Sequence, residues 1–153
     1  MMNNATPTTL KRLVTSSVLY IVVALLAATV AIRENLPAQP LGEGSGSGLP
    51  VTQDFLYGSG TAMSPGLISL IVQAILTVLA FRKNWWGTLG VAGLTISGLF
   101  GGVFALSEPI VKKIFSPATF DPWKAVIETG IIVIPFVMMI FGIFEWARRL
   151  RER

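Results

Sequence analysis

The sequence predicts an all-α membrane protein in which four transmembrane helices form a compact antiparallel bundle. Apolar residues make up 52% of the 153 residues and charged residues only 13%, whereas a soluble domain carries about 25% charged residues. The mean hydropathy is +0.68. Four apolar segments approach the length of about 20 residues that a helix needs to cross a bilayer. Continuous runs of this kind are typical of helices and not of the alternating strands of a barrel.

The four predicted spans occupy residues 13–32, 64–81, 88–106 and 123–146. Ser64-Pro65 and Asp121-Pro122 each combine an N-cap residue with proline at the first helical position, which is typical of a helix start. The first segment also resembles a signal peptide with a poor cleavage site. Its apolar run is longer than the roughly 7–15 residues of a signal peptide, so we expect a retained span.

The distribution of basic residues predicts that both termini lie in the cytoplasm. With this orientation eight Lys and Arg residues are inside and four are outside, in line with the positive-inside rule. The inner set is Lys11, Arg12, Arg82, Lys83, Arg148, Arg149, Arg151 and Arg153, and the outer set is Arg33, Lys112, Lys113 and Lys124. We therefore expect an integral protein of the plasma (cytoplasmic) membrane.

Two extracytoplasmic loops are expected within this single domain of residues 1–153. The first loop, residues 33–63, is rich in Gly, Ser and Pro, and its run at 42–48 is typical of a flexible linker. The second loop, residues 107–122, places apolar residues around two lysines, which favours a short interfacial helix. On the inner side, residues 82–87 form a tight turn that makes the second and third spans an antiparallel hairpin.

The residue types that are missing exclude several kinds of chemistry. The chain has no cysteine and no histidine. This excludes disulfides, thiolate nucleophiles, iron–sulfur ligation, imidazole bases and ordinary zinc sites. We therefore expect no catalytic constellation, no metal and no cofactor. No basic patch interleaves with aromatic residues, so nucleic acid is not an expected partner. The expected partners are the lipid bilayer and either further copies of the chain or a larger membrane complex.

Small residues follow one face of the third predicted span and allow another helix to approach closely. Gly98 and Gly102 form a GxxxG pair beside the main stripe. The predicted helix-packing face comprises Gly90, Gly93, Ser97, Gly98, Gly101, Gly102 and Ala105. Its partner is either a helix of the same chain, which we favour, or a neighbouring subunit.

The fourth predicted span contains one acid away from its ends, Glu128. An ionisable side chain within a membrane helix is costly and is therefore a functional candidate. Gln73 and Ser69 lie at similar depth on the second span, so the three residues form one polar cluster if these two spans touch. Structural interpretations compete with this one, and in the first of them Glu128 lies only at the membrane–water boundary. Glu128 is near a helix N-terminus, where the helix dipole favours negative charge, and Lys124 precedes it by one turn.

Glu145 marks the inner boundary of the fourth span. Arg148 and Arg149 follow it by three and four residues, and this spacing favours ion pairs on a helix surface. We expect a surface salt bridge here, with the basic residues beyond it lying on anionic headgroups.

Three functional hypotheses remain open. The leading one is a non-enzymatic assembly or accessory subunit that acts through helix packing. The alternative is an oligomeric small transporter or channel in which Glu128 exchanges a proton or cation with help from Gln73 and Ser69. A lipid-active enzyme is the weakest, because its chemistry would have to come from Glu, Ser or Tyr alone.

Overall fold

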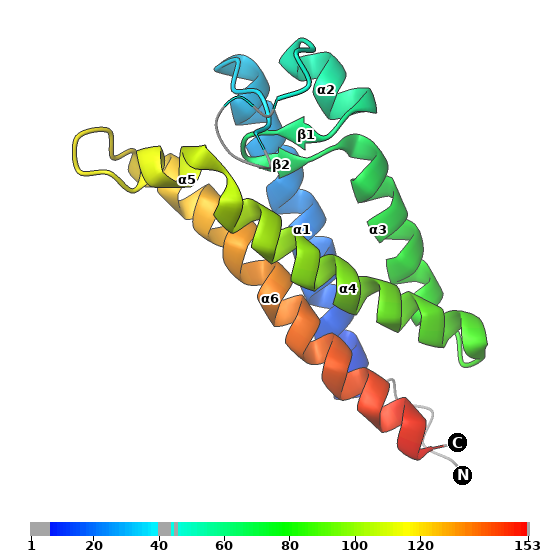
Figure 1. Cartoon of the computed structure of the whole chain (residues 1–153). Coiled ribbons are helices and arrows are strands. Elements are labelled where there is room, and N and C mark those ends of the chain that lie inside the picture. Colours follow the sequence, from blue (N-terminus) through cyan, green and yellow to red (C-terminus); the bar gives the residue numbers. More distant parts are fainter. Residues whose placement is uncertain (1–6, 40–43, 45, 153) are drawn as a thin grey trace.

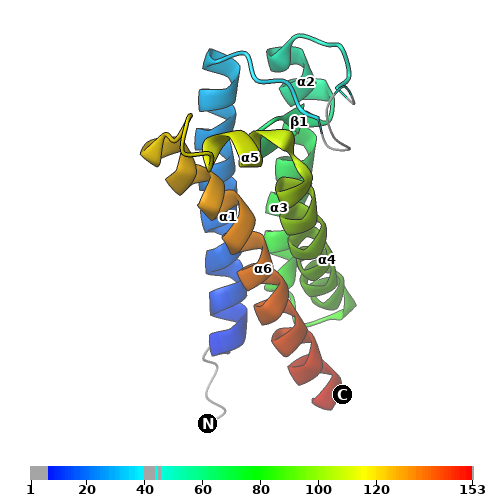
Figure 2. The ribbon, with the colours of Figure 1, turned by 60° about the vertical axis from the view of Figure 1, so that its left-hand side comes forward.

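The computed structural model describes residues 7–39, 44 and 46–152. Three long apolar helices and one shorter apolar helix pack together, as Figure 1 and Figure 2 show. The long helices are α1 (Thr8–Arg33), α4 (Trp85–Ser107) and α6 (Pro122–Arg151), and the shorter one is α3 (Leu67–Ala80). The smaller elements are α2 (Val51–Tyr57), β1 (Gly60–Thr61), β2 (Ser64–Pro65) and α5 (Pro109–Ile114). Part of the predicted linker at 42–48 lies outside the described residues.

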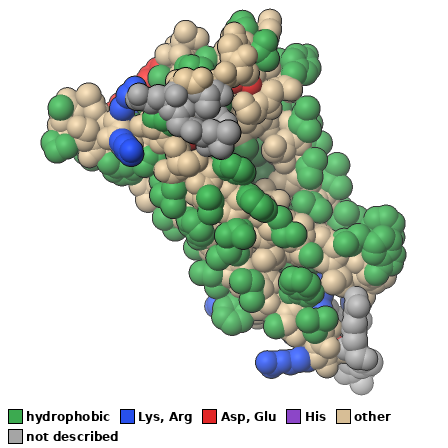
Figure 3. All heavy atoms as spheres, viewed as in Figure 1, with side chains coloured by type: hydrophobic (Ala, Val, Ile, Leu, Met, Phe, Trp, Pro, Cys, Tyr) green, Lys and Arg blue, Asp and Glu red, His purple; other side chains and the backbone are tan. Residues whose placement is uncertain are grey.

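The long helices carry the signature of an integral membrane protein. Each of the three is long and apolar enough to span a bilayer, and only 33% of the most apolar window of each is buried inside the protein. The rest of these windows presents Leu, Val, Ile and Phe to the surroundings. In Figure 3 hydrophobic side chains cover the length of the molecule, while basic side chains appear toward its two ends. Exposed apolar surface of this extent suits lipid and not water.

Helix α6 packs against both α1 and α4, and α3 packs against α4 and to a smaller extent against α1. α3 therefore lies across the bundle from α6. The face of α1 that meets its neighbours is built from small residues: Ala24, Ala27, Ala28 and Ala31 are all buried. Small side chains let helix backbones approach closely, so van der Waals contact holds the helices together.

The two ends of the bundle differ in construction. The first turn of α1, the last turn of α6 and the short turn at 82–84 lie together at one end, which we call the terminal end. At the other end, the loop end, β1 and β2 form an antiparallel hairpin in which Thr61 pairs with Ser64. Pro37 forms a further β-bridge to Thr61, and this bridge ties the first loop to the hairpin.

One of the two predicted helix starts is confirmed and the other is wrong. The Asp121 carboxylate accepts hydrogen bonds from the backbone N–H groups of Trp123 and Lys124 and caps α6. By contrast, Ser64 and Pro65 form strand β2, and α3 begins only at Leu67. A residue before proline favours extended backbone, and here the hairpin uses that preference. α3 is consequently about 21 Å long at 1.5 Å per residue, shorter than the predicted span at 64–81.

The small residues of α4 contact other helices of the same chain. A Cβ atom at Gly90 would meet backbone atoms of α3, with Ala80 N at 2.5 Å. At Gly98 it would meet Pro135 O of α6 at 2.5 Å, and at Gly102 it would meet the Phe136 ring at 2.7 Å. Gly93 faces the Leu76 side chain, Gly101 faces Tyr20 and Pro135, Ala105 is buried and Ser97 is half-buried. Much of the predicted packing face is therefore covered by α3 and α6.

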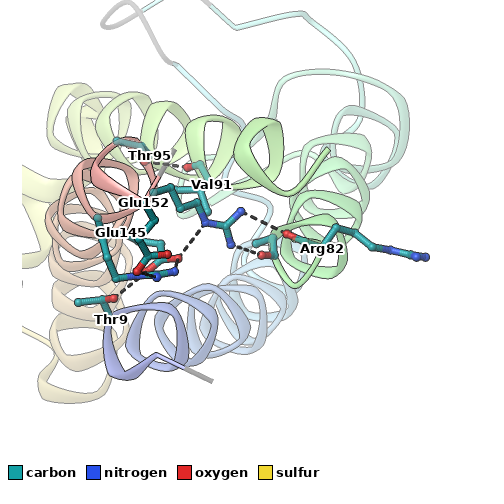
Figure 4. A network of polar contacts seen from close by, with 9 residues as sticks. Thr9, Arg82, Val91, Thr95, Glu145 and Glu152 are labelled. Carbon is teal, nitrogen blue, oxygen red and sulfur yellow. Dashed lines mark hydrogen bonds and ion pairs between the residues drawn. The ribbon is translucent and has the colours of Figure 1, made fainter. Parts of the chain in front are cut away.

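Polar contacts join three helices at the terminal end, as Figure 4 shows. Glu145 of α6 accepts hydrogen bonds from Thr9 of α1 at 2.6 Å, from Arg148 Nη2 at 2.7 Å and from Arg149 Nε at 2.9 Å. Arg149 also donates to the carbonyl oxygen of Ala80 at the end of α3. The Glu145 side chain is fully buried, so the prediction of a surface salt bridge was wrong. The prediction failed because α1 packs over the Glu145 carboxylate.

Candidate functional site

The structure separates Gln73 from the other two residues of the predicted polar cluster. Gln73 Nε2 donates to Ser17 Oγ at 3.2 Å and contacts Met138 Sδ at 3.4 Å. Ser17 Oγ also forms a hydrogen bond with Thr77 Oγ1 at 2.7 Å. All of these side chains are buried. The amide of Gln73 thus joins α3 to α1 and α6 in the interior, and it does not reach Glu128.

Glu128 and Ser69 line the same cavity, which has a volume of about 460 Å³ and lies toward the loop end. The remaining walls come from α1, the β1–β2 hairpin and α4. Its lining combines two acids, several hydroxyl groups and apolar side chains. These residues are Tyr20, Ser59, Thr61, Ala62, Met63, Ser64, Pro65, Ser69, Gly101, Phe104, Ala105, Glu108, Glu128 and Ile131.

Glu128 is the most unusual group of this site. Its side chain is 0% exposed, and neither carboxylate oxygen has a hydrogen-bond partner among the described residues. The pairing with Lys124 that its position allowed is not formed: Lys124 Nζ lies 2.6 Å from Glu34 Oε2 and 3.6 Å from Asp121 Oδ2. A buried carboxylate without a partner is expensive, and a bound ion or a chemical role are among the explanations for such a group.

Glu108, the second acid of the cavity, is buried between α4 and α5. Both of its carboxylate oxygens accept a hydrogen bond from the backbone N–H of Gln39, at 3.0 and 3.2 Å. Burial raises the pKa of Glu108 to about 7, against the smaller lowering effect of that hydrogen bond. The protonation state of Glu108 therefore changes near neutral pH, and it does so at the contact that fastens the first loop to the bundle.

This pKa predicts that thermal stability falls as the pH rises from about 4.5 to about 7. The folded state holds the Glu108 proton more tightly than the unfolded chain, whose usual value is 4.5. The stabilisation is thus fully present below pH 4.5 and is lost as the pH passes 7. Melting temperatures of the detergent-solubilised protein measured across this window should show the decline. Glu108→Gln should flatten it, while an equal decline in the variant would assign it to other groups.

The cavity opens between α3 and α4. Ser69 on α3 and Phe104 on α4 both line it and both are exposed, whereas Glu128 and Ile131 at its far side are buried. Figure 1 shows that α3 and α4 separate toward the loop end after leaving their common turn at 82–84. The exposed faces of the two helices beside this opening are apolar, with Ile68 56% and Phe100 53% exposed.

Several residues of the cavity were not among the sequence-predicted candidates. Tyr20 lies on a helix whose sequence is largely apolar. A buried tyrosine needs a polar partner for its hydroxyl group, so Tyr20 could have been predicted as a candidate from the sequence. Glu108 lies in the second predicted loop, 107–122, and was not singled out there. The sequence did not indicate that residues 59–65 belong to this site, because only the tertiary fold brings them over the helices.

Chemically, the site can neutralise and hold a positively charged group. It offers the carboxylate of Glu128, a second acid at Glu108 and the hydroxyl groups of Tyr20 and Ser69, and none of the described Lys and Arg residues contributes to its lining. Among the described residues no three His, Cys, Asp or Glu side chains gather as a metal site. Comparison of the chain with protein-family models, with curated proteins and with solved structures gave no match.

Proposed function

We propose that the chain is a small membrane transporter whose buried carboxylate, Glu128, exchanges a cation for a proton in the loop-end cavity. The observation that carries this proposal is the absence of any hydrogen-bond partner for either Glu128 oxygen among the described residues, in a side chain that lines a cavity. Either a proton or a bound cation neutralises such a group, and the two compete for the same oxygens. This competition is the minimal chemistry of exchange.

The proposal includes a topology with four membrane helices and both termini in the cytoplasm. In support, the start of α1 and the end of α6 meet at the terminal end through Thr9 and Glu145, so the chain crosses the bundle an even number of times. The basic residues gathered at that end favour the cytoplasm. The cavity then belongs to the extracytoplasmic half of the membrane, and the plasma membrane stays the expected location.

One argument for the accessory-subunit hypothesis is weakened by the packing of α4. It relied on the small residues of α4 as a surface for another subunit, yet Gly98 and Gly102 face Pro135 and Phe136 of the same chain. Assembly with further copies stays a prediction, since a bundle of this size has little room for a complete pathway of its own. The stronger observation is the cavity, and it favours transport.

Proteoliposomes with a trapped pH-sensitive dye test the exchange. Gradients of Na⁺, K⁺ or tetraethylammonium are applied in turn, and at least one is expected to drive proton movement through the wild-type protein. Glu128→Gln keeps the size of the side chain but removes its titratable charge, and we expect it to reduce this rate at least tenfold, or about 1.4 kcal/mol in barrier.

Glu152→Gln is the matched control, because Glu152 is an exposed acid of the same helix at the terminal end. Its exchange rate should equal that of the wild type. Equal rates in Glu128→Gln and wild type would contradict the proposal. A protein inactive with every gradient that co-purifies with a stoichiometric foreign subunit would establish the accessory role instead.

A further inference from the structure

We propose that the cavity binds a small organic cation that carries one positive charge on an apolar body and enters between α3 and α4. This inference rests on the proposed role of Glu128 and narrows the class of ligand that the carboxylate receives. It combines three features of the cavity: its charge, its size and lining, and the position of its opening.

The charge of the ligand follows from the hydrogen bonds of the two acids. Glu108 already accepts the backbone N–H of Gln39 at both oxygens. Glu128 has no such partner among the described residues, and the part of the lining that the structure describes contains no Lys or Arg. One carboxylate is therefore left to be neutralised, and a single positive charge satisfies it. An ammonium group would also supply the hydrogen-bond donors that these two oxygens need.

The size and walls of the cavity favour an organic body over a bare ion. Its volume of about 460 Å³ lies within the roughly 300–1,000 Å³ of small-molecule sites, and a water molecule takes only about 30 Å³. Much of the wall is apolar, with Met63, Ala105 and Ile131 buried around it. A hard metal ion prefers about six or more oxygen ligands, whereas no group of three acidic, His or Cys side chains occurs in the described ranges.

The position of the opening favours entry from the lipid. Ser69 and Phe104 form an exposed rim on α3 and α4, while residues 61–64 of the hairpin line the cavity at the loop end and are buried. An organic cation concentrates at the membrane interface with its apolar part in the acyl region and its charge among the headgroups. From there the apolar body passes between the two helices, and the charged group reaches the hydroxyl of Ser69 before Glu128.

Binding of benzylammonium to the protein in lipid nanodiscs tests the inference. Benzylammonium combines one charge with an apolar ring, and benzyl alcohol is its neutral counterpart. Isothermal titration is expected to show saturable binding of benzylammonium to the wild type and none of benzyl alcohol. Glu128→Gln should weaken benzylammonium binding at least about tenfold. Ala105→Leu, which extends an apolar side chain into the cavity, should weaken it to a similar degree, and Glu152→Gln should leave it unchanged.

Two results would overturn the inference. Benzylammonium binding that is unaltered in both Glu128→Gln and Ala105→Leu would place the ligand elsewhere. Equal affinity for benzyl alcohol would show that charge is not recognised. If benzylammonium fails to bind while Na⁺ or K⁺ still drives exchange that depends on Glu128, the ligand class is wrong and the proposed function stands. If benzylammonium binds as expected but no cation gradient drives exchange, the binding site is supported and the proposed transport function is wrong.

Discussion

Gly98→Ala is expected to destabilise the protein strongly, because it places a methyl group in the contact between α4 and α6. A Cβ atom at this position would lie 2.5 Å from Pro135 O and 2.8 Å from Met139 N. Both are backbone atoms of α6, so neither can rotate away as a side chain would. The two helices must separate, and their close contact is lost over the neighbouring turns. Overpacking of this kind costs about 1–3 kcal/mol, and we expect the upper part of that range.

Gly101→Ala is the matched control for this variant. It lies on the same helix, and its Cβ atom would meet the Tyr20 hydroxyl at 3.3 Å and Pro135 Cβ at 3.6 Å. Alanine also has a higher helix propensity than glycine by about 1 kcal/mol, so the Gly101 variant should be neutral or slightly stabilised. Unfolding in detergent with an increasing fraction of SDS measures both. Equal midpoints for Gly98→Ala and wild type would contradict the observed packing of α4 against α6.

Removal of the Glu145 carboxylate is the second change with a large expected effect. Glu145 is fully buried and receives hydrogen bonds from Thr9, Arg148 and Arg149. In Glu145→Ala, Arg149 loses its anionic partner, Arg148 keeps only Glu152, and Thr9 loses the acceptor that holds α1 against α6. Breaking a buried ion pair costs about 3–5 kcal/mol. We expect a loss of about 3 kcal/mol in the free energy of unfolding, at the lower end of this range. The side chains of both arginines are partly exposed, so their charges are not left fully buried.

Glu152→Ala provides the comparison. Glu152 also pairs with Arg148, but its side chain is 60% exposed, and exposed pairs contribute about 0–1 kcal/mol. The same SDS titration should therefore separate the two variants clearly. A loss for Glu145→Ala no larger than that for Glu152→Ala would show that the terminal-end contacts do not hold the bundle together.

The apolar character and the long helices could be predicted from the sequence because they depend on local composition. Lipid requires long continuous apolar runs, and α1, α4 and α6 have them. Helix boundaries were less predictable. Asp121 and Ser64 present the same cap-and-proline pattern, yet only Asp121 begins a helix, because Ser64 pairs with Thr61 in the β1–β2 hairpin instead.

The same distinction applies to the candidate site: a local feature predicted Glu128, whereas tertiary contacts decide which residues lie beside it. Glu128 was identified because a charged residue in an apolar run is unusual in any fold. Gln73 was predicted beside it from depth alone, but Gln73 contacts Ser17 of α1 and Met138 of α6 instead. Met138 follows Glu128 by about three helical turns, so the two side chains lie at different depths. Depth counted from a predicted helix start fails when the starts of two helices are not level, and the order of the helices around the bundle cannot be counted from the sequence either. Tyr20 and Glu108 reach the cavity only through that order.

Infrared difference spectroscopy of the carboxyl groups tests the central claim most directly. Spectra of the protein in nanodiscs are recorded with and without benzylammonium, for wild type and for Glu128→Gln. If the Glu128 carboxyl group receives the cation, ligand addition changes the carboxyl and carboxylate bands of the wild type, and this change is absent from the variant. Identical difference spectra for the two proteins would contradict the account, because the cation would then be bound without Glu128.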